Sequence, residues 1–314
     1  MAHVASLSQL QRPRWASVNG SLVDYEDVKI HVSAEALTRA LSVFEGMKGY
    51  WDESSEEFGL RTPERHYARL RRSAALFEIP IDFTREGYVD AGMALGRKLL
   101  TTDKDLWFRT TLYVVDGHWG EGTRADLVIT AFRQSKDLAP PMKLGVSTWR
   151  RSGDVQLPAR VKSSANYVVA RLARIEVGRR GCDDAVMLND HGRVAEGTGS
   201  CIVSLVDGVV VTPPVSEGAL PSLSLDVVEQ ICRRDGIPFE RRPLERSELL
   251  VADEVALVGT ITELTPVGEI DGYQYRTDGL LAELRRRYLA VMRRAEALEG
   301  IEFAKLKASA IEST

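Results

Sequence analysis

The spacing of hydrophobic positions predicts that strands and helices alternate through the first part of the chain. Apolar runs on both sides of Asn19-Gly20 predict a β-hairpin, because this pair favours a tight turn with positive φ. Apolar residues recur at helical spacing over 63–77, and Thr84 is a suitable N-cap for a helix over 86–100. The elements expected here are a hairpin at 15–23, helices at 33–41, 63–77 and 86–100, and strands at 43–51, 105–116 and 126–132.

The second part of the chain is richer in strands. Its expected strands are 144–149, 184–188, 193–205, 209–212, 239–242, 254–259 and 264–270, with helices at 165–178, 224–235 and 280–292. The second part of the chain has few helices for its many strands, which is unlike a doubly wound βαβ sheet. The polar stretch 133–142, with Pro140-Pro141, is the best linker candidate. We therefore expect a loose segment at 1–14, a small α/β domain at 15–132, the linker at 133–142 and a larger domain at 143–314.

Composition excludes several classes of protein. The net charge of −4 over 314 residues gives no reason to expect a nucleic-acid or anionic-membrane partner. The longest apolar runs are far shorter than the roughly 20 residues that span a bilayer. The 3 cysteines are widely spaced and the 5 histidines show no metal-binding spacing, so we expect no disulfide framework, no metal and a cytoplasmic location.

A lysine at the start of a predicted helix is the first candidate for chemistry. Lys162 precedes Ser163 and Ser164, which can cap the helix over 165–178. The field of the helix dipole opposes a positive charge there, which suits a nucleophilic amine. A solvated lysine beside a helix is the other interpretation.

A carboxylate and two turns are further candidates. Glu196 lies in a predicted strand beside Gly197 and Gly199, where a ligand can approach the backbone closely. Such a carboxylate could hold a proton on a heterocyclic nitrogen, or it could be an exposed strand residue. The turns 218–224 and 259–262 offer free amides that suit a phosphate, and each could equally be an ordinary cap or turn.

Two arginines complete the set. Arg69 falls on the arginine-rich side of its predicted helix, where exposure to solvent is the usual arrangement. Arg109 interrupts a strand-like run and needs a partner, for which a substrate carboxylate and a buried acid are equally suitable.

Taken in order, these features resemble the class IV (fold type IV) pyridoxal-phosphate aminotransferases, most closely the branched-chain amino acid aminotransferases. The resemblance extends from about Trp15 to Asp271. Its matching stretches are Ser42–Gly46, Arg69-Leu70, Lys162–Tyr167, Arg193–Ser200, Gly208–Pro214, Ala252–Glu254, and Gly259-Thr260 through Thr265-Pro266. The resemblance implies a small α/β domain, a larger pseudo-barrel domain, and pyridoxal 5′-phosphate (PLP) in the cleft between them.

The resemblance also assigns roles. Lys162 is implied as the residue that binds PLP covalently and moves the proton, Glu196 as the partner of the pyridine nitrogen, and Tyr167 as the partner of the 3-oxygen. The expected phosphate ligands and ring contact are Arg69, Leu223, Ser224, Thr260, Ile261 and Leu220. The expected substrate contacts are Arg39, Trp107, Arg109 and Thr262.

The implied reaction is a ping-pong transamination between an amino acid, branched-chain or glutamate, and a 2-oxo acid. A homodimer or higher homo-oligomer is expected, with the loop 116–122 reaching towards the neighbouring subunit's site.

The chain departs from the branched-chain pattern in its substrate pocket. Thr38-Arg39-Ala40 replaces His-Tyr-Gly, so Arg39 replaces a pocket tyrosine. Trp107-Phe108-Arg109 replaces Tyr-x-Arg, and a second tyrosine is missing from 133–137. Arg39 and Arg109 together are expected to favour dicarboxylate or polar substrates, unless Arg39 faces solvent or pairs with a nearby acid.

Three alternatives therefore stay open. One is a class IV transaminase for D-amino acids, (R)-amines or a secondary-metabolite keto acid. Another is aminodeoxychorismate lyase, which eliminates pyruvate on the same fold. The third is a non-catalytic protein that retains the fold, which an intact Lys162 and Glu196 disfavour.

Overall fold

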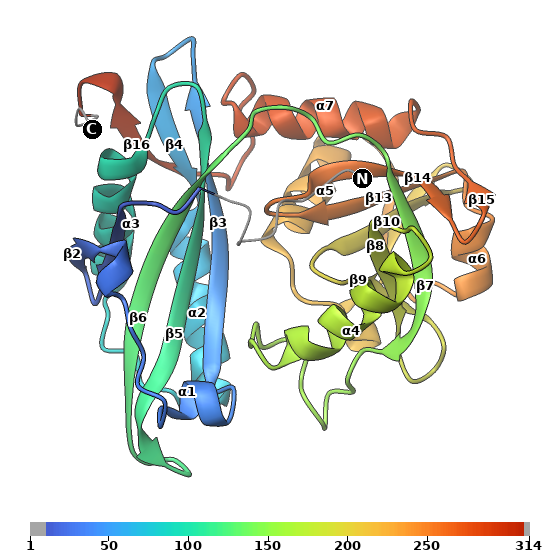
Figure 1. Cartoon of the computed structure of the whole chain (residues 1–314). Coiled ribbons are helices and arrows are strands. Elements are labelled where there is room, and N and C mark those ends of the chain that lie inside the picture. The colour runs from blue at the N-terminus through green and yellow to red at the C-terminus, as the bar shows by residue number, and fades with distance from the viewer. Residues whose placement is uncertain (1–10, 311–314) are drawn as a thin grey trace. The chain divides into compact units, whose positions relative to one another are not determined.

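The computed structural model describes residues 11–310, which form two compact units (Figure 1). The N-terminal unit contains 11–137, 161–165 and 299–310, and the C-terminal unit contains 138–160 and 166–298. The sequence-based boundaries differ, since they assign everything from 143 onward to the second domain. Most of the expected loose segment 1–14 lies outside the described residues.

The N-terminal unit is built on an antiparallel sheet. Its strand order is β16-β4-β3-β5-β6-β1-β2. The strands are β1 (Trp15–Val18), β2 (Ser21–Asp24), β3 (Ser42–Asp52), β4 (Glu57–Arg61), β5 (Asp105–His118), β6 (Glu121–Gln134) and β16 (Phe303–Lys307). The helices are α1 (Glu35–Thr38), α2 (Pro63–Leu76) and α3 (Arg85–Leu99), with short 3-10 turns at Tyr25–Asp27 and Ala308–Ala310.

Local sequence accounts for several of these elements. Asn19 and Gly20 have φ of 47° and 86°, as the predicted tight turn between β1 and β2 requires. The Thr84 side chain accepts a hydrogen bond from the Gly87 N–H at 3.0 Å and so caps α3 as expected. Alternate residues of β3 and β5, including Val43 and Phe108, pack with α2 and α3 in one hydrophobic core. Only the other face of these strands is therefore left for a site (Figure 1).

The β5–β6 hairpin is longer than its hydrophobic pattern predicts. The polar stretch 117–124 was expected to be a loop, but Asp116 pairs with Arg124 and His118 with Glu121. The turn is reduced to Trp119 and Gly120, with φ of 52° and 94°. Both strands are solvated at this end, so no apolar alternation marks them.

The C-terminal unit contains a mixed sheet. The strand order is β12-β11-β10-β13-β14-β7-β8-β9, with β15 paired to β14. The strands are β7 (Met142–Arg150), β8 (Asp184–Leu188), β9 (Val194–Gly197), β10 (Cys201–Val206), β11 (Val209–Thr212), β12 (Phe239–Arg241), β13 (Glu254–Gly259), β14 (Glu263–Ile270) and β15 (Tyr273–Gln274). The helices are α4 (Asn166–Gly178), α5 (Leu223–Arg234), α6 (Arg246–Leu250) and α7 (Leu280–Met292), with a 3-10 turn at Val215–Glu217.

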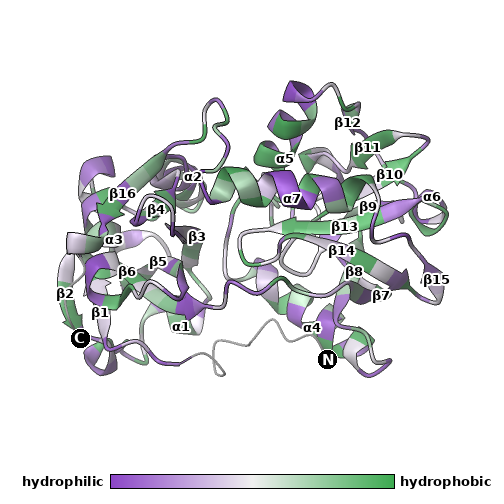
Figure 2. Ribbon diagram, turned by 90° about the horizontal axis from the view of Figure 1, so that it is seen from above, coloured by the Kyte–Doolittle hydropathy of each residue, from purple (hydrophilic) through white to green (hydrophobic). Residues whose placement is uncertain are grey.

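Three strands of this sheet are buried along their whole length. Every residue of β8, β9 and β13 is buried, and their sequences are mostly apolar, with one acid in each: Asp184, Glu196 and Glu254 (Figure 2). The predicted strand 193–205 is wrong in one respect, because it is interrupted between β9 and β10. There the Gly197 N–H donates to Ser200 O at 2.7 Å and closes a tight turn. This turn places Glu196 at the end of a strand rather than in its middle.

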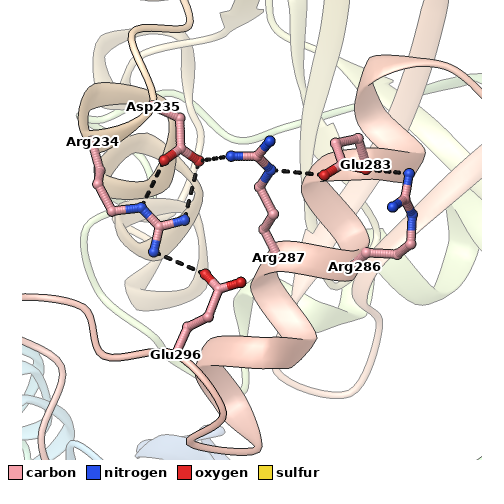
Figure 3. Close-up of polar contacts among 6 residues, drawn as sticks. All are labelled: Arg234, Asp235, Glu283, Arg286, Arg287 and Glu296. Atoms are coloured by element: carbon pink, nitrogen blue, oxygen red, sulfur yellow. Dashed lines mark hydrogen bonds and ion pairs between the residues drawn. The ribbon is translucent and has the colours of Figure 1, made fainter.

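A network of ion pairs joins the end of α5 to α7 (Figure 3). Asp235 receives Arg234 Nε at 2.7 Å and also pairs with Arg287. Arg234 reaches Glu296 at 3.0 Å, and Arg287 reaches Glu283 at 2.9 Å. Asp235, Arg234 and Arg287 therefore each have two ion-pair partners. Such a network holds α5 and α7 together more firmly than isolated surface pairs would.

None of the helices in 11–310 is long and apolar enough to span a membrane.

Candidate active site

Candidate residues of the N-terminal unit gather on the face of β3 and β5 that lies away from α2 and α3. Gly46 lies opposite Arg109, and Phe44 lies opposite Thr111, so these side chains share one face. The Arg109 guanidinium carbon lies 3.5 Å from the centroid of the Phe44 ring. Arg109 is therefore held on an aromatic surface, half-buried, rather than extended into solvent.

Trp107 occupies the same face. Its ring stacks on Phe132 with centroids 5.7 Å apart. A Cβ atom added to Gly46 would lie 3.3 Å from Trp107 Nε1, so the glycine leaves room for the indole to cross β3. Two predicted substrate contacts, Trp107 and Arg109, thus lie side by side on β5.

Lys162 joins this face through the backbone. The Phe44 N–H donates to Lys162 O at 2.9 Å, and the Lys162 N–H donates to Ser73 Oγ at 3.1 Å. Ser163 forms an antiparallel bridge with Val43. The segment 161–165 is therefore fixed to β3 and α2, and Lys162 Nζ lies 4.7 Å from the Phe44 ring centroid. The structure thus brings Lys162 and Arg109, which are far apart in the sequence, to the same ring.

Arg69 is buried, so its predicted exposure on the polar side of the helix is wrong. It is 4% exposed, and its Nε and one terminal nitrogen each donate to Glu45 at 2.7 Å. His66 Nδ1 lies 2.8 Å from the same carboxylate. Burial favours the neutral acid, but Arg69 and His66 outweigh it and lower the pKa of Glu45 to about 2. The Arg69 guanidinium is fixed in position because the Glu45 carboxylate that it binds faces α2.

This buried cluster predicts acid sensitivity. Burial lowers the pKa of His66 to about 4, and hydrogen bonding to Glu45 offsets only part of that effect. As the pH falls from 7 to 5, the unfolded chain binds a proton at His66 that the folded chain does not, so stability falls by about 2 kcal/mol. In His66→Asn, whose amide can still donate to Glu45, thermal unfolding should depend less on pH over this range. An unchanged slope would show that other groups cause the loss.

Arg39 pairs with an acid of its own helix. Its terminal nitrogen donates to Glu35 at 2.9 Å, and its guanidinium carbon lies 4.6 Å from the centroid of the Trp119 ring. This arrangement matches the second of the two interpretations of Arg39, a pair with a nearby acid.

Glu196 is the centre of the candidate residues in the C-terminal unit. One carboxylate oxygen pairs with Arg151 at 3.0 Å, and the other accepts the Leu220 N–H at 2.9 Å. Arg151 also donates to Gly218 O and to Asn166 O, each at 3.4 Å. The arginine therefore links three segments: the carboxylate strand β9, the turn that carries Leu220, and the start of α4 with Tyr167 as its second residue.

Two further elements supply backbone amides. Ser222 caps α5 by accepting the Leu225 N–H at 3.2 Å, and the first turn of α5, with Leu223 and Ser224, lies at the positive end of the helix dipole. Gly259 pairs with Glu263 across β13 and β14. The hairpin loop between them consists of Thr260, Ile261 and Thr262, whose amides lie outside the ladder hydrogen bonds.

Sequence reasoning missed two residues that organise these groups. Glu45 has a detectable signal, because it alternates with Val43 and Met47 on the core face, where an acid needs a buried partner. Arg151 has none, since it begins a polar loop and looks like any exposed arginine. It is nevertheless only 6% exposed.

The donor set fits PLP. An amine, a phenol and a buried carboxylate match the aldehyde carbon, 3-oxygen and pyridine nitrogen, and the amides of α5 and of the loop 260–262 suit a phosphate. Ser200 adds an independent sign, because its buried hydroxyl has no hydrogen-bond partner within residues 11–310. It lies between the ends of β9 and β13, where a Cβ on Gly197 would lie 2.9 Å from its oxygen.

Comparisons with known proteins give the same result. Residues 42–270 match the family model "Amino-transferase class IV". The branched-chain-amino-acid aminotransferase of Escherichia coli K12 is 32% identical over 265 residues, which are 82% of this chain and 84% of that protein. The branched-chain aminotransferase of Thermoproteus uzoniensis with norvaline has a TM-score of 0.86 at 30% identity, covering 90% and 95% of the two chains. The branched-chain amino acid aminotransferase of Thermobaculum terrenum, in its PLP form, has a TM-score of 0.83 at 30% identity, covering 91% and 95%.

The fold and the site define a fold type IV enzyme, which confirms the predicted fold class. The chain belongs to the class IV aminotransferase family. It is a PLP-dependent aminotransferase, so the predictions of the enzyme class and of the cofactor are confirmed.

Proposed function

We propose that this enzyme transfers an amino group between an aliphatic amino acid of the branched-chain type and a 2-oxo acid, with glutamate and 2-oxoglutarate as the second pair in a ping-pong cycle. The observation that carries the proposal is the common support of Lys162 and Arg109 on the Phe44 ring. This shared support favours the proposal, because the amine that we propose as the nucleophile and the guanidinium that we propose as a carboxylate ligand then share one sheet face. The names of the similar proteins support the substrate class.

The residues of this chain would divide the work as follows. When bound, PLP supplies the electron sink that stabilises negative charge at the substrate Cα. Lys162 Nζ would take the proton from the substrate Cα and deliver it to C4′ of the cofactor. Glu196 holds the proton on the pyridine nitrogen, with its orientation fixed by Arg151 and the Leu220 N–H.

Substrate and phosphate would be held by separate groups. Arg109 would bind the side-chain carboxylate of glutamate or 2-oxoglutarate, and the amides of the loop 260–262 would hold the α-carboxylate of either substrate through Thr262. Arg69, with its geometry fixed by Glu45, and the first turn of α5 hold the phosphate, and Tyr167 holds the 3-oxygen.

A half-reaction screen tests the substrate class. Each amino donor is mixed with the holoenzyme, and the change in the visible absorbance of the cofactor is followed over time. We expect fast changes with L-leucine, L-isoleucine, L-valine and L-glutamate, and slow ones with D-amino acids and (R)-amines. Fast reaction with the D- or (R)-compounds, and none with the L-amino acids, would contradict the proposal.

We also propose a homodimer in the cytoplasm. Two apolar residues of the N-terminal unit are strongly exposed: Val32 at 72% and Leu37 at 59%. Exposed apolar side chains of this size favour burial against a second copy. Sedimentation velocity should give a dimer that Leu37→Asp weakens, whereas a monomer at micromolar concentration would refute it.

The proposed location rests on the cysteines. The 3 cysteines are free thiols, as in reducing compartments.

A further inference from the structure

A buried carboxylate joins α1 to the tip of the β5–β6 hairpin. Glu35 is 3% exposed at its side chain, and the Arg39 side chain that it binds is 34% exposed. The oxygen that receives Arg39 also accepts the Trp119 backbone N–H at 3.2 Å. The guanidinium lies on the Trp119 ring at the same time. One acid therefore fixes both an arginine and an exposed tryptophan.

The second oxygen of Glu35 is buried and has no hydrogen-bond partner in the described part of the chain. Leaving a buried polar atom without a hydrogen-bond partner is unfavourable, and more so for a charged group. A neutral glutamine could accept the Trp119 N–H at lower cost, so holding the hairpin does not by itself require the charge. Among the described residues, the carboxylate of Glu35 forms an ion pair with one cation, Arg39.

This acid lies close to the sheet face that carries the proposed substrate contacts. Ala36, the next residue of α1, lines a cavity of about 280 Å³ together with Ser42 and Thr111. Thr111 lies directly opposite Phe44, which supports Arg109 and Lys162. The remaining lining residues are Val28, Lys29, Ile30, Tyr113 and Val128, so three aliphatic side chains lie beside one lysine and one tyrosine.

We propose that Glu35 is a positioning residue for substrate choice, because it neutralises Arg39 and so allows aliphatic side chains beside a guanidinium. The inference rests on the proposed function, since it concerns the substrate of that same site. An unpaired guanidinium attracts carboxylates and is costly to desolvate against an alkyl group. When it is paired with Glu35, the guanidinium of Arg39 adds no net charge to the site. Its contact with the Trp119 ring also keeps it from turning towards the substrate.

The first test compares two acceptors. Glu35→Gln keeps the shape and the acceptor for Trp119 but removes the charge. The ratio of kcat/KM for 2-oxoglutarate to that for 2-oxoisocaproate should rise about three- to fivefold, as expected for a partly exposed charge pair. In an Arg39→Met background the same substitution should leave the ratio unchanged, because Glu35 acts through Arg39.

The matched control is Glu283→Gln. Glu283 pairs with Arg287 at the same i,i+4 spacing on α7 and also with Arg286, so this variant removes carboxylate–arginine pairing elsewhere and should not change the ratio. An unchanged ratio in Glu35→Gln would overturn the inference. An equal change in the Arg39→Met background would also overturn it, since Glu35 would then act without Arg39.

The second test does not depend on turnover. The fluorescence of Trp119, taken as the difference between the parent and Trp119→Phe, is quenched with iodide and with neutral acrylamide. In Glu35→Gln, the uncompensated Arg39 should raise quenching by iodide about twofold and leave quenching by acrylamide unchanged. Equal increases for both quenchers would mean that the hairpin has loosened, and would overturn the inference.

The two tests separate the two proposals. If the parent enzyme transfers an amino group to neither acceptor, the proposed function fails. Iodide quenching then still decides whether Glu35 neutralises Arg39.

Discussion

Lys162→Ala is expected to lose transamination by more than about 10³-fold while the cofactor still binds. Proton transfer by a positioned side chain contributes roughly 10²- to 10⁴-fold, and the variant also loses the covalent link to PLP. Binding should survive, because Arg69, the first turn of α5 and the loop 260–262 are unchanged. Lys162 lies at the Phe44 ring and is held there through its backbone, so its loss should not unfold β3.

Three measurements check this result. The visible absorbance of the parent should shift to that of free PLP in the variant. Borohydride treatment of the parent should fix the cofactor to the peptide that contains Lys162, and methylamine added to the variant should restore part of the proton transfer.

Lys143→Ala is the matched control. Lys143 is a half-buried lysine that pairs with Glu269 at 2.8 Å, and its removal should change neither the absorbance nor the rate. Recovery of the fixed cofactor on any lysine other than Lys162 would refute the assignment.

The sequence predicted most elements whose pattern is local. Helices α2, α3, α5 and α7 have apolar faces with recognisable ends, and their predicted bounds differ from the observed ones by only a few residues. The strands β8, β11 and β13 are short apolar runs between clear turns, and their predicted ranges match those observed. In these segments the hydrophobic pattern and the turn residues point to the same structure.

Elements that depend on distant partners could not be predicted in this way. β4 and β16 pair with each other although the chain separates them by most of its length. The segment 161–165 belongs to the N-terminal unit because it is hydrogen-bonded to β3, which no linker composition reveals. The boundary between the domains was therefore placed too simply, as one cut in the chain.

The same distinction applies to the candidate site. Motif order identified Lys162, Glu196 and Arg109, because spacing along the chain is enough to match a family. It did not identify what holds them: the ring of Phe44, the carboxylate of Glu45 behind Arg69, and the guanidinium of Arg151 behind Glu196. These supports are long-range contacts, and they decide which direction each functional group faces. The substrate pocket depends on them most, since Arg39 has a different meaning with Glu35 beside it.

Glu196→Gln is expected to lower kcat by roughly 10²-fold or more with little change in PLP affinity. The amide keeps the shape and can still accept the Leu220 N–H, but it no longer holds the proton on the pyridine nitrogen, so the negative charge at Cα is less stabilised. The loss should fall on kcat more than on KM, because substrate carboxylates bind elsewhere. Both are measured by steady-state kinetics, and PLP affinity by titration of the apoenzyme.

A second buried acid shows whether such a loss is merely structural. Glu217 lies in the same unit, is 5% exposed, and receives two hydrogen bonds from Arg193 at 2.7 and 2.9 Å. Glu217→Gln breaks a buried carboxylate–arginine pair much as Glu196→Gln does, so both variants should lose stability by similar amounts. Only Glu196→Gln should lose turnover, because only Glu196 is proposed to meet the cofactor. If the two variants lost turnover equally, or if Glu196→Gln kept near-normal kcat, Glu196 would be a structural residue, and the pyridine nitrogen would need another partner.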